Sequence, residues 1–223
     1  TFYWRVRAID DLGNVGLNSD SFSFRIDSAM TVALSQPSAG HETNVAAVRF
    51  DWSSNLADTY TWQLSKISTF ATITDSAVDT GAENLIRTIP HQDTFYWRVI
   101  GKDTYGNMDT ASARGIVLDT QTATVVLSSP SDGHETTNAS VVVSWSAVSD
   151  SVGIDSYAVE ASKSSAFTGT FTFTDTLDGA LTSDTITGLY NDTYFWRVRA
   201  IDDLGNVGSN SASRGFILDT SVG

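Results

Sequence analysis

Apolar and polar residues alternate with a period of two along most of the chain, which is the pattern of half-buried β-strands. At the start, Phe2 and Trp4 fall on one face of such a strand, and Tyr3 and Arg5 fall on the other. The same alternation returns later, in residues 50–52, 60–64, 141–145 and 157–161. Helix signals are nearly absent, and Gly-Asn or Asp-Gly pairs separate the alternating runs as turns. The pattern predicts an all-β chain of many short strands.

These strands belong to a repeat. Trp4, Trp97 and Trp196 lie in the segments TFYWRV, TFYWRV and TYFWRV, at spacings of 93 and 99 residues. The first 18 residues agree with residues 193–210 at 15 of 18 positions. Fixed spacing of this kind predicts tandem structural units. We expect the last two strands of an incomplete unit in residues 1–28, complete units in residues 29–120 and 121–220, and the start of a further unit in residues 221–223.

Each complete unit has the length and pattern of a β-sandwich. About 95 residues with about seven short strands and regular turn signals are typical of two packed antiparallel sheets of the immunoglobulin type. The fold class expected for this chain is therefore all-β, in tandem antiparallel β-sandwiches.

Two segments resemble known families. LDTQTATVVLSSPSDGHETTNASVVVSWSA (118–147) resembles the first two strands of the immunoglobulin-like and fibronectin type III-like repeats of large bacterial and archaeal surface proteins. DTYFWRVRAIDDLGN (192–206) is similar to the sixth strand and following turn of fibronectin type III modules. The resemblance implies a tyrosine corner at Phe2, Phe95 and Tyr194, of which only Tyr194 keeps the hydroxyl. It also implies a core tryptophan in the second strand, matched by Trp52 and Trp145.

Composition narrows the classes of function. The 223 residues carry 26 acids against 13 Lys and Arg, a formal net charge of -13, which argues against nucleic acid as a partner and leaves divalent cations as possible partners. The chain has no Cys, so a disulfide framework or a thiolate site is excluded. No apolar run reaches the roughly 20 residues of a membrane-spanning helix. We expect an extracellular, cell-surface or secreted protein stabilised by its hydrophobic cores.

The search for catalytic groups is negative. His41 and His134 lie in two GHET segments, which we interpret as a turn between the first two strands. A zinc-protease helix needs a second His four residues on, where Val45 and Asn138 stand instead. No GxSxG nucleophile elbow occurs. We therefore predict that the chain is not an enzyme and requires no cofactor.

Acidic residues at unit junctions and in turns are candidate ligands of Ca²⁺, which binds clustered oxygen atoms on loops. The alternative is structural, because Asp and Asn are the residues that tight turns prefer. We favour the junction acids over the turn acids. The junction candidates are Asp27, Asp119 and Asp219, and the turn candidates are Asp10, Asp11, Asp202 and Asp203.

Two further sets of residues are candidate contact or modification sites. The opening segment is expected to form two strands, which alone would expose apolar side chains and unpaired edges. We predict that it completes another unit, either in the same polypeptide or in another chain, through Phe2, Trp4, Phe22 and Phe24. The sequons at Asn138 and Asn191 are glycosylation candidates in a host that glycosylates.

Three functions compete on this basis. The first is a structural repeat of an extracellular fibre, filament or surface layer, in which tandem sandwiches contact mainly their neighbours. The second is an adhesin or carbohydrate-binding module with recognition loops at one end. The third is an accessory part of a secreted enzyme. Uniform repeats without a distinctive long loop favour the first, with copies of the chain or adjacent repeats as partners.

Overall fold

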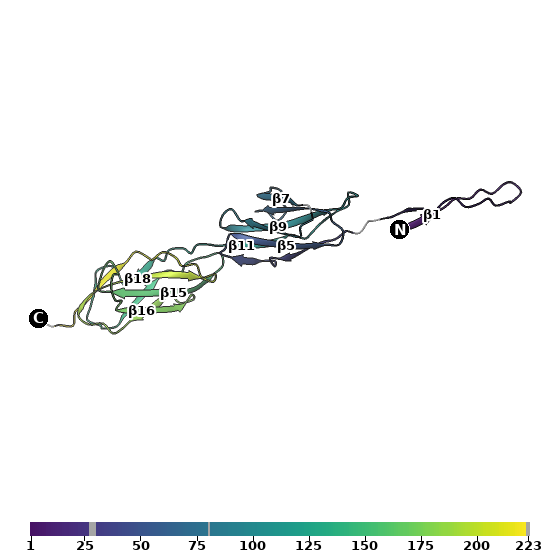
Figure 1. Ribbon diagram of the computed structural model, residues 1–223. Helices are drawn as coiled ribbons and strands as arrows, with labels where there is room; N and C mark the ends of the chain where they lie inside the picture. The colour runs from purple at the N-terminus through teal and green to yellow at the C-terminus, as the bar shows by residue number, and fades with distance from the viewer. Residues whose placement is uncertain (27–29, 80, 222–223) are drawn as a thin grey trace.

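The computed structural model describes residues 1–26, 30–79 and 81–221. These residues form 19 strands and no helix. None of them can therefore cross a membrane as an apolar helix. Figure 1 shows two β-sandwiches arranged end to end and a hairpin set apart beyond the first of them. The expected all-β fold in tandem sandwiches is confirmed.

The first sandwich, called sandwich 1 here, is built from residues 32–118. One sheet has the strand order β3-β5-β8, and the other has the order β4-β11-β9-β6-β7, with β10 paired to β9. The strands are β3 (Val32–Gln36), β4 (His41–Thr43), β5 (Ala47–Ser54), β6 (Thr59–Ser65), β7 (Asp75–Asp79), β8 (Asn84–Thr88), β9 (Asp93–Lys102), β10 (Met108–Thr110) and β11 (Arg114–Leu118).

The second sandwich, sandwich 2, repeats this topology in residues 127–218. Its sheets have the orders β12-β14-β17 and β13-β19-β18-β15-β16. The strands are β12 (Leu127–Ser129), β13 (His134–Thr136), β14 (Val141–Trp145), β15 (Ile154–Ser162), β16 (Phe173–Asp178), β17 (Ser183–Ile186), β18 (Asp192–Asp202) and β19 (Arg214–Leu218).

Each sandwich contains one parallel pair of strands, which the sequence did not reveal. β4 pairs parallel to β11, and β13 pairs parallel to β19. The two GHET segments were therefore interpreted wrongly as turns. Only their glycines turn, with φ of +72° at Gly40 and +75° at Gly133, and the residues that follow are strands. Pro37 and Pro130 have no N–H for a strand ladder, so the chain leaves the first sheet there and joins the last strand of the other.

An arginine clamps this crossing in both sandwiches. Arg114 on β11 donates hydrogen bonds to the carbonyl oxygens of Leu34, Ser35 and Pro37, at 2.6 to 2.9 Å. Arg214 on β19 makes the same three bonds to Leu127, Ser128 and Pro130 in sandwich 2. Each clamp satisfies backbone oxygens that the interrupted strand leaves without a ladder partner.

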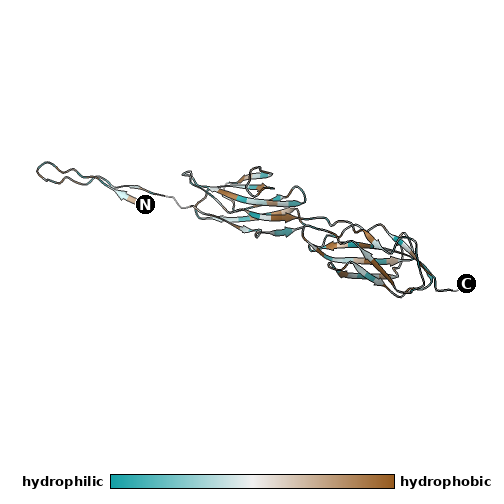
Figure 2. Cartoon of the chain, turned by 180° about the vertical axis from the view of Figure 1, so that it is seen from behind, coloured by the Kyte–Doolittle hydropathy of each residue, from teal (hydrophilic) through white to brown (hydrophobic). Residues whose placement is uncertain are grey.

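The cores are aromatic and lie between the two sheets of each sandwich. Figure 2 shows hydrophobic and hydrophilic residues alternating along the strands, which places one face of each sheet inside. The tryptophans of the repeat are internal: Trp52 and Trp145 are each 3% exposed, and Trp97 and Trp196 are fully buried. The interpretation of these tryptophans as core residues is confirmed for both sandwiches.

The hairpin differs because no second sheet covers it. β1 (Phe2–Trp4) and β2 (Phe22–Phe24) pair with each other, and Phe2 stacks on Phe24 with ring centroids 5.4 Å apart. Trp4 is 49% exposed, whereas its equivalent in sandwich 2, Trp196, is fully buried between the sheets. The hairpin therefore carries the core side chains of a sandwich on an open face.

Candidate metal centre at the junction of the sandwiches

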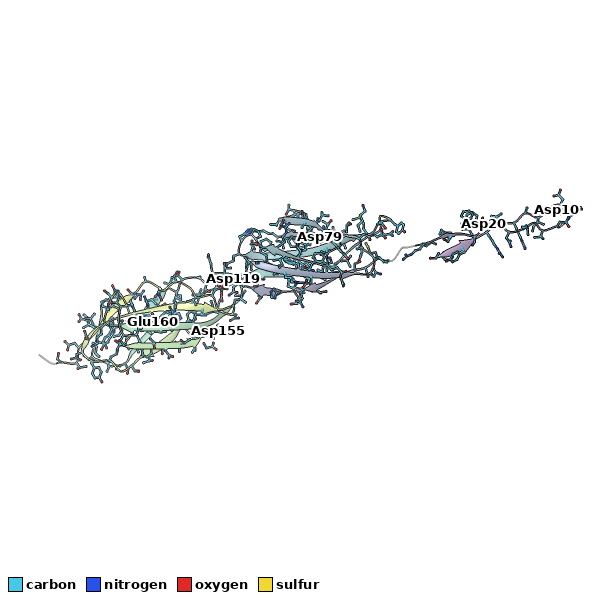
Figure 3. All side chains as sticks on the ribbon, in the orientation of Figure 1. Asp10, Asp20, Asp79, Asp119, Asp155 and Glu160 are labelled. Atoms are coloured by element: carbon cyan, nitrogen blue, oxygen red, sulfur yellow. The ribbon has the colours of Figure 1, made fainter. Side chains whose placement is uncertain are left out.

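The linker between the two sandwiches is held from both sides. Asp119 follows β11, and its N–H donates to the carbonyl oxygen of Thr43 in sandwich 1, at 2.9 Å. Its own carbonyl oxygen accepts a hydrogen bond from Nδ2 of Asn206 in sandwich 2, at 3.0 Å. Asp119 is fully buried, and Figure 3 places it at the waist between the two sandwiches.

Asp202 reaches the same point from the turn that follows β18. Its carboxylate accepts hydrogen bonds from the N–H groups of Leu204 and Asn206, at 2.9 and 2.8 Å, and from Nδ2 of Asn206, at 2.7 Å. Gly205 has a φ of +80°, a conformation that glycine adopts without a Cβ penalty. A third contact comes from the linker, where Oγ1 of Thr122 donates to the Asp202 carboxylate at 3.1 Å.

The same capped turn occurs three times. Asp10 accepts hydrogen bonds from Leu12 and Asn14, and Asp103 accepts them from Tyr105 and Asn107. The turn acids at the first position of these turns thus have a structural role in all three units. Among the described residues, Asp202 alone of these three turn acids belongs to a group of three close carboxylates.

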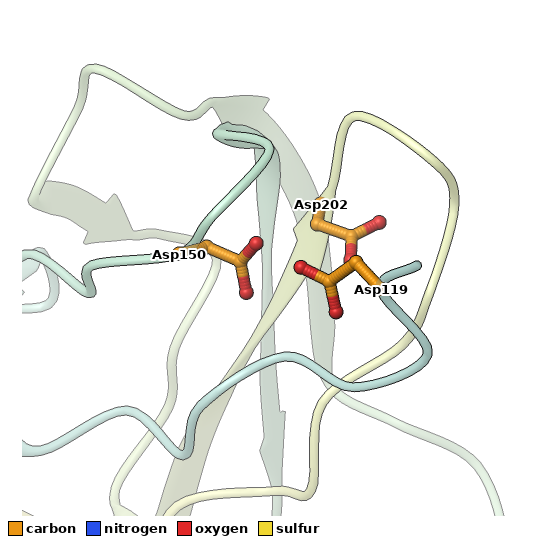
Figure 4. A group of neighbouring side chains, drawn as sticks. All are labelled: Asp119, Asp150 and Asp202. Carbon is orange, nitrogen blue, oxygen red and sulfur yellow. The ribbon is translucent and has the colours of Figure 1, made fainter. Parts of the chain in front are cut away.

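Three carboxylates meet at the junction. Oxygen atoms of Asp119, Asp150 and Asp202 all lie within 4.8 Å of one another, and Figure 4 shows the carboxyl groups of Asp119 and Asp150 facing each other with Asp202 next to Asp119. Asp150 comes from the loop between β14 and β15, where sandwich 2 has additional residues compared with sandwich 1. Sequence reasoning missed Asp150, although that longer loop, SAVSDSVGID, was its available signal.

The pKa values of the Asp119 and Asp150 carboxyl groups are shifted in opposite directions. Burial opposes ionisation of Asp119, but hydrogen bonds from Ser151, the Gln121 N–H and Asp150 outweigh it and lower the pKa of Asp119. Burial raises the pKa of Asp150, and the negative charges of Asp119 and Asp202 add to that effect. A negative charge is therefore held more easily on Asp119 than on Asp150.

The charge of this cluster is not balanced by basic side chains. Within residues 1–26, 30–79 and 81–221, the ion pairs involve other acids, and none reaches Asp119, Asp150 or Asp202. Such a cluster is neutralised by taking up a proton or by a cation. Carboxylate oxygens on loops are the ligands that Ca²⁺ takes, together with carbonyl oxygens.

Of the predicted metal ligands that lie in the described part of the chain, Asp119 and Asp202 are brought together. Asp10 and Asp11 lie in the exposed turn of the hairpin, far from the waist (Figure 3). Asp203 follows Asp202 in the chain but is exposed. Asp219 lies at the other end of sandwich 2. Asp27 lies outside the described residues. The sequence separated junction acids from turn acids, whereas the structure places one of each in the same cluster.

The remaining candidates lie apart from the cluster. Asn138 is exposed between β13 and β14, and its Oδ1 accepts the N–H of Ser140 at 3.0 Å. Asn191 is exposed before β18, and its Oδ1 accepts from Thr220 at 2.8 Å. Glycosylation stays a prediction at both asparagines.

Comparisons with known proteins concern the fold. No protein-family model matches the chain, and no curated protein matches it. Among solved structures, 343 chains match. The fibronectin(III)-like modules of Clostridium thermocellum CbhA are 13% identical, with a TM-score of 0.38, over 85% of this chain and 94% of that one. The FN1–FN3 domains of chicken CNTN1 are 16% identical, with a TM-score of 0.41, over 97% of this chain and 77% of that one.

The strand topology by itself is that of tandem antiparallel-dominated β-sandwiches. At such low identity the likeness says nothing of activity or partners, and the bacterial or archaeal origin that the sequence suggested stays a prediction.

Proposed function

We propose that this chain is a non-catalytic structural segment of an extracellular fibre, filament or surface layer, in which β-sandwiches join end to end. The observation that carries the proposal is the junction between the sandwiches. A buried linker residue, Asp119, is hydrogen-bonded by Thr43 of sandwich 1 and by Asn206 of sandwich 2. A backbone carbonyl of sandwich 1 and a side chain of sandwich 2 therefore fix the direction in which the chain continues.

This construction is what a spacer needs. Domains joined by an exposed linker move relative to each other by default, because few contacts cross between them. Here Nδ2 of Asn44 also donates to the carbonyl oxygen of Leu204 across the junction, at 3.0 Å. A junction of this kind holds two units at one angle, so that adding units adds length. No feature of the described residues gives comparable support to the adhesin or the enzyme-accessory alternative.

The hairpin supports assembly through neighbouring sandwiches. Trp4 and Phe24 are about half exposed, whereas their equivalents Trp196 and Phe216 pack in the core of sandwich 2. We propose that the hairpin face binds the remaining strands of a further sandwich, in the same polypeptide or in another chain. The apolar area covered there would supply the driving force.

The Ca²⁺ prediction is now confined to one place. We propose that a divalent cation binds at Asp119, Asp150 and Asp202 and stiffens the junction. The support is the chemistry of the cluster, namely three close carboxylates without a basic partner among the described residues. The structural role does not depend on this cation, because the hydrogen bonds across the junction are present in addition to the cluster.

Double electron–electron resonance, which measures the distance between two spin labels, tests the structural role directly. The chain has no native cysteine, so spin labels can be attached to Ile86→Cys and Thr185→Cys, one exposed position on each sandwich. A rigid junction gives one narrow distance distribution, and Asn44→Ala should broaden it. A broad distribution in the parent pair would contradict the proposal. Imaging of the native material should in addition show particles joined end to end.

A further inference from the structure

Two hydrogen bonds at the end of sandwich 1 set the direction of the linker as it leaves that sandwich. The N–H of Asp119 bonds to Thr43, the last residue of β4, and Oε1 of Gln92 accepts the N–H of Thr120 at 3.2 Å. Oδ1 of Asp119 then accepts the N–H of Gln121 at 3.1 Å. The direction of the linker is thus set before sandwich 2 begins.

Sandwich 2 repeats this arrangement at its own far end. The N–H of Asp219 bonds to Thr136, the last residue of β13, at 3.0 Å. Oδ1 of Asn191 accepts the N–H of Thr220 at 3.1 Å, and Oδ1 of Asp219 accepts the N–H of Ser221 at 2.9 Å. The groups that guide the linker at the junction are therefore present a second time.

The surface around this second exit is open, whereas the first is covered. At the first exit, the turn of residues 202–206 lies against the end of sandwich 1 and leaves Asp119 with no exposed surface. At the second exit, Asp219 is exposed and Ile217 is 37% exposed. A groove of about 610 Å³ lies there, lined by Glu135, Thr136, Thr137, Ile217 and Asp219.

The strand register makes the two surfaces equivalent. Glu42 of β4 pairs with Val117 of β11, and Glu135 of β13 pairs with Ile217 of β19. Asn44 follows β4, as Thr137 follows β13, so the groove occupies the place where the Leu204 turn docks on sandwich 1.

We propose that the groove at the end of sandwich 2 is the docking surface of a further β-sandwich of this repeat, which presents an Asp-Asp-Leu-Gly-Asn turn like residues 202–206. The inference rests on the proposed structural function and extends it to a named surface and a partner of stated chemistry. The incoming asparagine donates to the carbonyl oxygen of Asp219, as Asn206 does to Asp119.

One of the differences between the two surfaces removes a hydrogen bond. Asn44 reaches the carbonyl oxygen of Leu204 with its amide nitrogen, and the shorter side chain of Thr137 stands in its place. The second docking surface therefore lacks one of the hydrogen bonds of the first. Restoring it by Thr137→Asn should tighten the contact.

The test appends a second copy of residues 121–220 directly after Thr220. The same linker and the same incoming sandwich then meet two different surfaces in one molecule, the end of sandwich 1 and the end of sandwich 2. Spin labels at Thr185→Cys and at the appended copy of Thr185 report on the new junction. The pair Ile86→Cys and Thr185→Cys reports on the original one.

The expected result is a narrow distance distribution at both junctions, with Thr137→Asn narrowing the new one further. A narrow distribution at the original junction together with a broad one at the new junction overturns this inference and leaves the proposed function standing. Broad distributions at both junctions overturn the proposed function as well. Circular dichroism of the appended chain, compared with the parent, verifies that the added sandwich is folded.

Discussion

A carboxyl oxygen of Asp150 lies within 4.8 Å of a carboxyl oxygen of Asp119, although the two residues come from a loop of sandwich 2 and from the linker. The two groups have opposite effects on stability as the pH changes. Asp119, with a lowered pKa, contributes stability above its unfolded pKa and loses it as the pH falls. Asp150, with a raised pKa, costs stability at neutral pH and ceases to do so as the pH falls through its folded value.

We expect Asp150→Asn to stabilise sandwich 2 in the absence of divalent cations at pH 7, because the amide cannot ionise and so removes the cost of a buried charge beside Asp119 and Asp202. The advantage over the parent chain should shrink as the pH falls toward about 4, the ordinary pKa of Asp. Thermal unfolding between pH 4 and pH 8 measures it. A stability difference between Asp150→Asn and the parent chain that does not vary with pH would contradict the raised pKa of Asp150.

The proposed cation site predicts that Asp150→Asn has the opposite effect on stability, relative to the parent chain, when Ca²⁺ is present. Binding only to the folded state stabilises by mass action, by about 2.7 kcal/mol when free Ca²⁺ is about 100 times its Kd. We expect CaCl₂ to raise the melting temperature of the parent chain, EDTA to reverse the rise, and Asp150→Asn to abolish it. Asp203→Asn is the matched control, since it removes the same charge from an exposed neighbour. Equal rises in both variants would rule out binding at the cluster.

Asp184 should destabilise sandwich 2. It occupies the position opposite Val143 that Leu85 occupies opposite Phe50 in sandwich 1. Its Oδ2 is buried without a hydrogen-bond partner, and burial together with the charge of Asp175 raises its pKa. We expect Asp184→Leu to stabilise sandwich 2 by about 1 kcal/mol at pH 7.

Because the folded pKa of Asp184 is raised, the gain from Asp184→Leu should decrease at acid pH, where the parent carboxyl is protonated. Chemical unfolding at pH 4 and pH 7 compares the two chains. An Asp184→Leu variant that is less stable than the parent at pH 7 would show instead that the Asp184 carboxyl group makes a stabilising contact.

The tyrosine corner should contribute to one sandwich only. Oη of Tyr194 donates to the carbonyl oxygen of Tyr190 and accepts its N–H, both at 3.0 Å. Tyr194→Phe should cost sandwich 2 about 1 to 1.5 kcal/mol, since buried backbone groups lose a partner. Sandwich 1 already has Phe95 at this position, so its unfolding transition should not move. A common shift of both transitions would indicate that the sandwiches unfold as one unit.

The hairpin should be dispensable for the fold of the sandwiches. We expect deletion of residues 1–26 to leave the unfolding transitions of both sandwiches unchanged, because β1 and β2 belong to a separate sheet. Binding of a dye that fluoresces on apolar surfaces should decrease, since Phe2, Trp4, Phe22 and Phe24 are removed. End-to-end polymers that persist after the deletion would contradict a role of the hairpin in assembly.

The corner hydrogen bond of Tyr194 was implied by the resemblance to fibronectin type III modules. The sandwich fold and the positions of the core tryptophans were predicted from the sequence pattern itself. These follow from local information, because a period of two fixes which side chains share a face of a strand. The sequence also identified Asp119 and Asp202 as candidate ligands, since linkers and turns can be recognised from the repeat itself.

Three features were not visible in the sequence. The parallel pairing of β4 with β11 depends on which strand β4 reaches after the chain leaves the first sheet, and no local sequence pattern specifies this. Asp150 lies 31 residues after Asp119 and 52 before Asp202, so its membership of the cluster could not be found by spacing. The open groove beside Asp219 became evident only when the ends of the two sandwiches could be compared.

The sequence by itself determined the units of this protein, because alternation and repetition are properties of the chain. Only the tertiary structure decided how one unit meets the next. The reason is physical: the junction is made by backbone carbonyl oxygens and by carboxylates from three separate segments. Their positions depend on sheet twist, loop length and register, which are set when the whole sandwich folds.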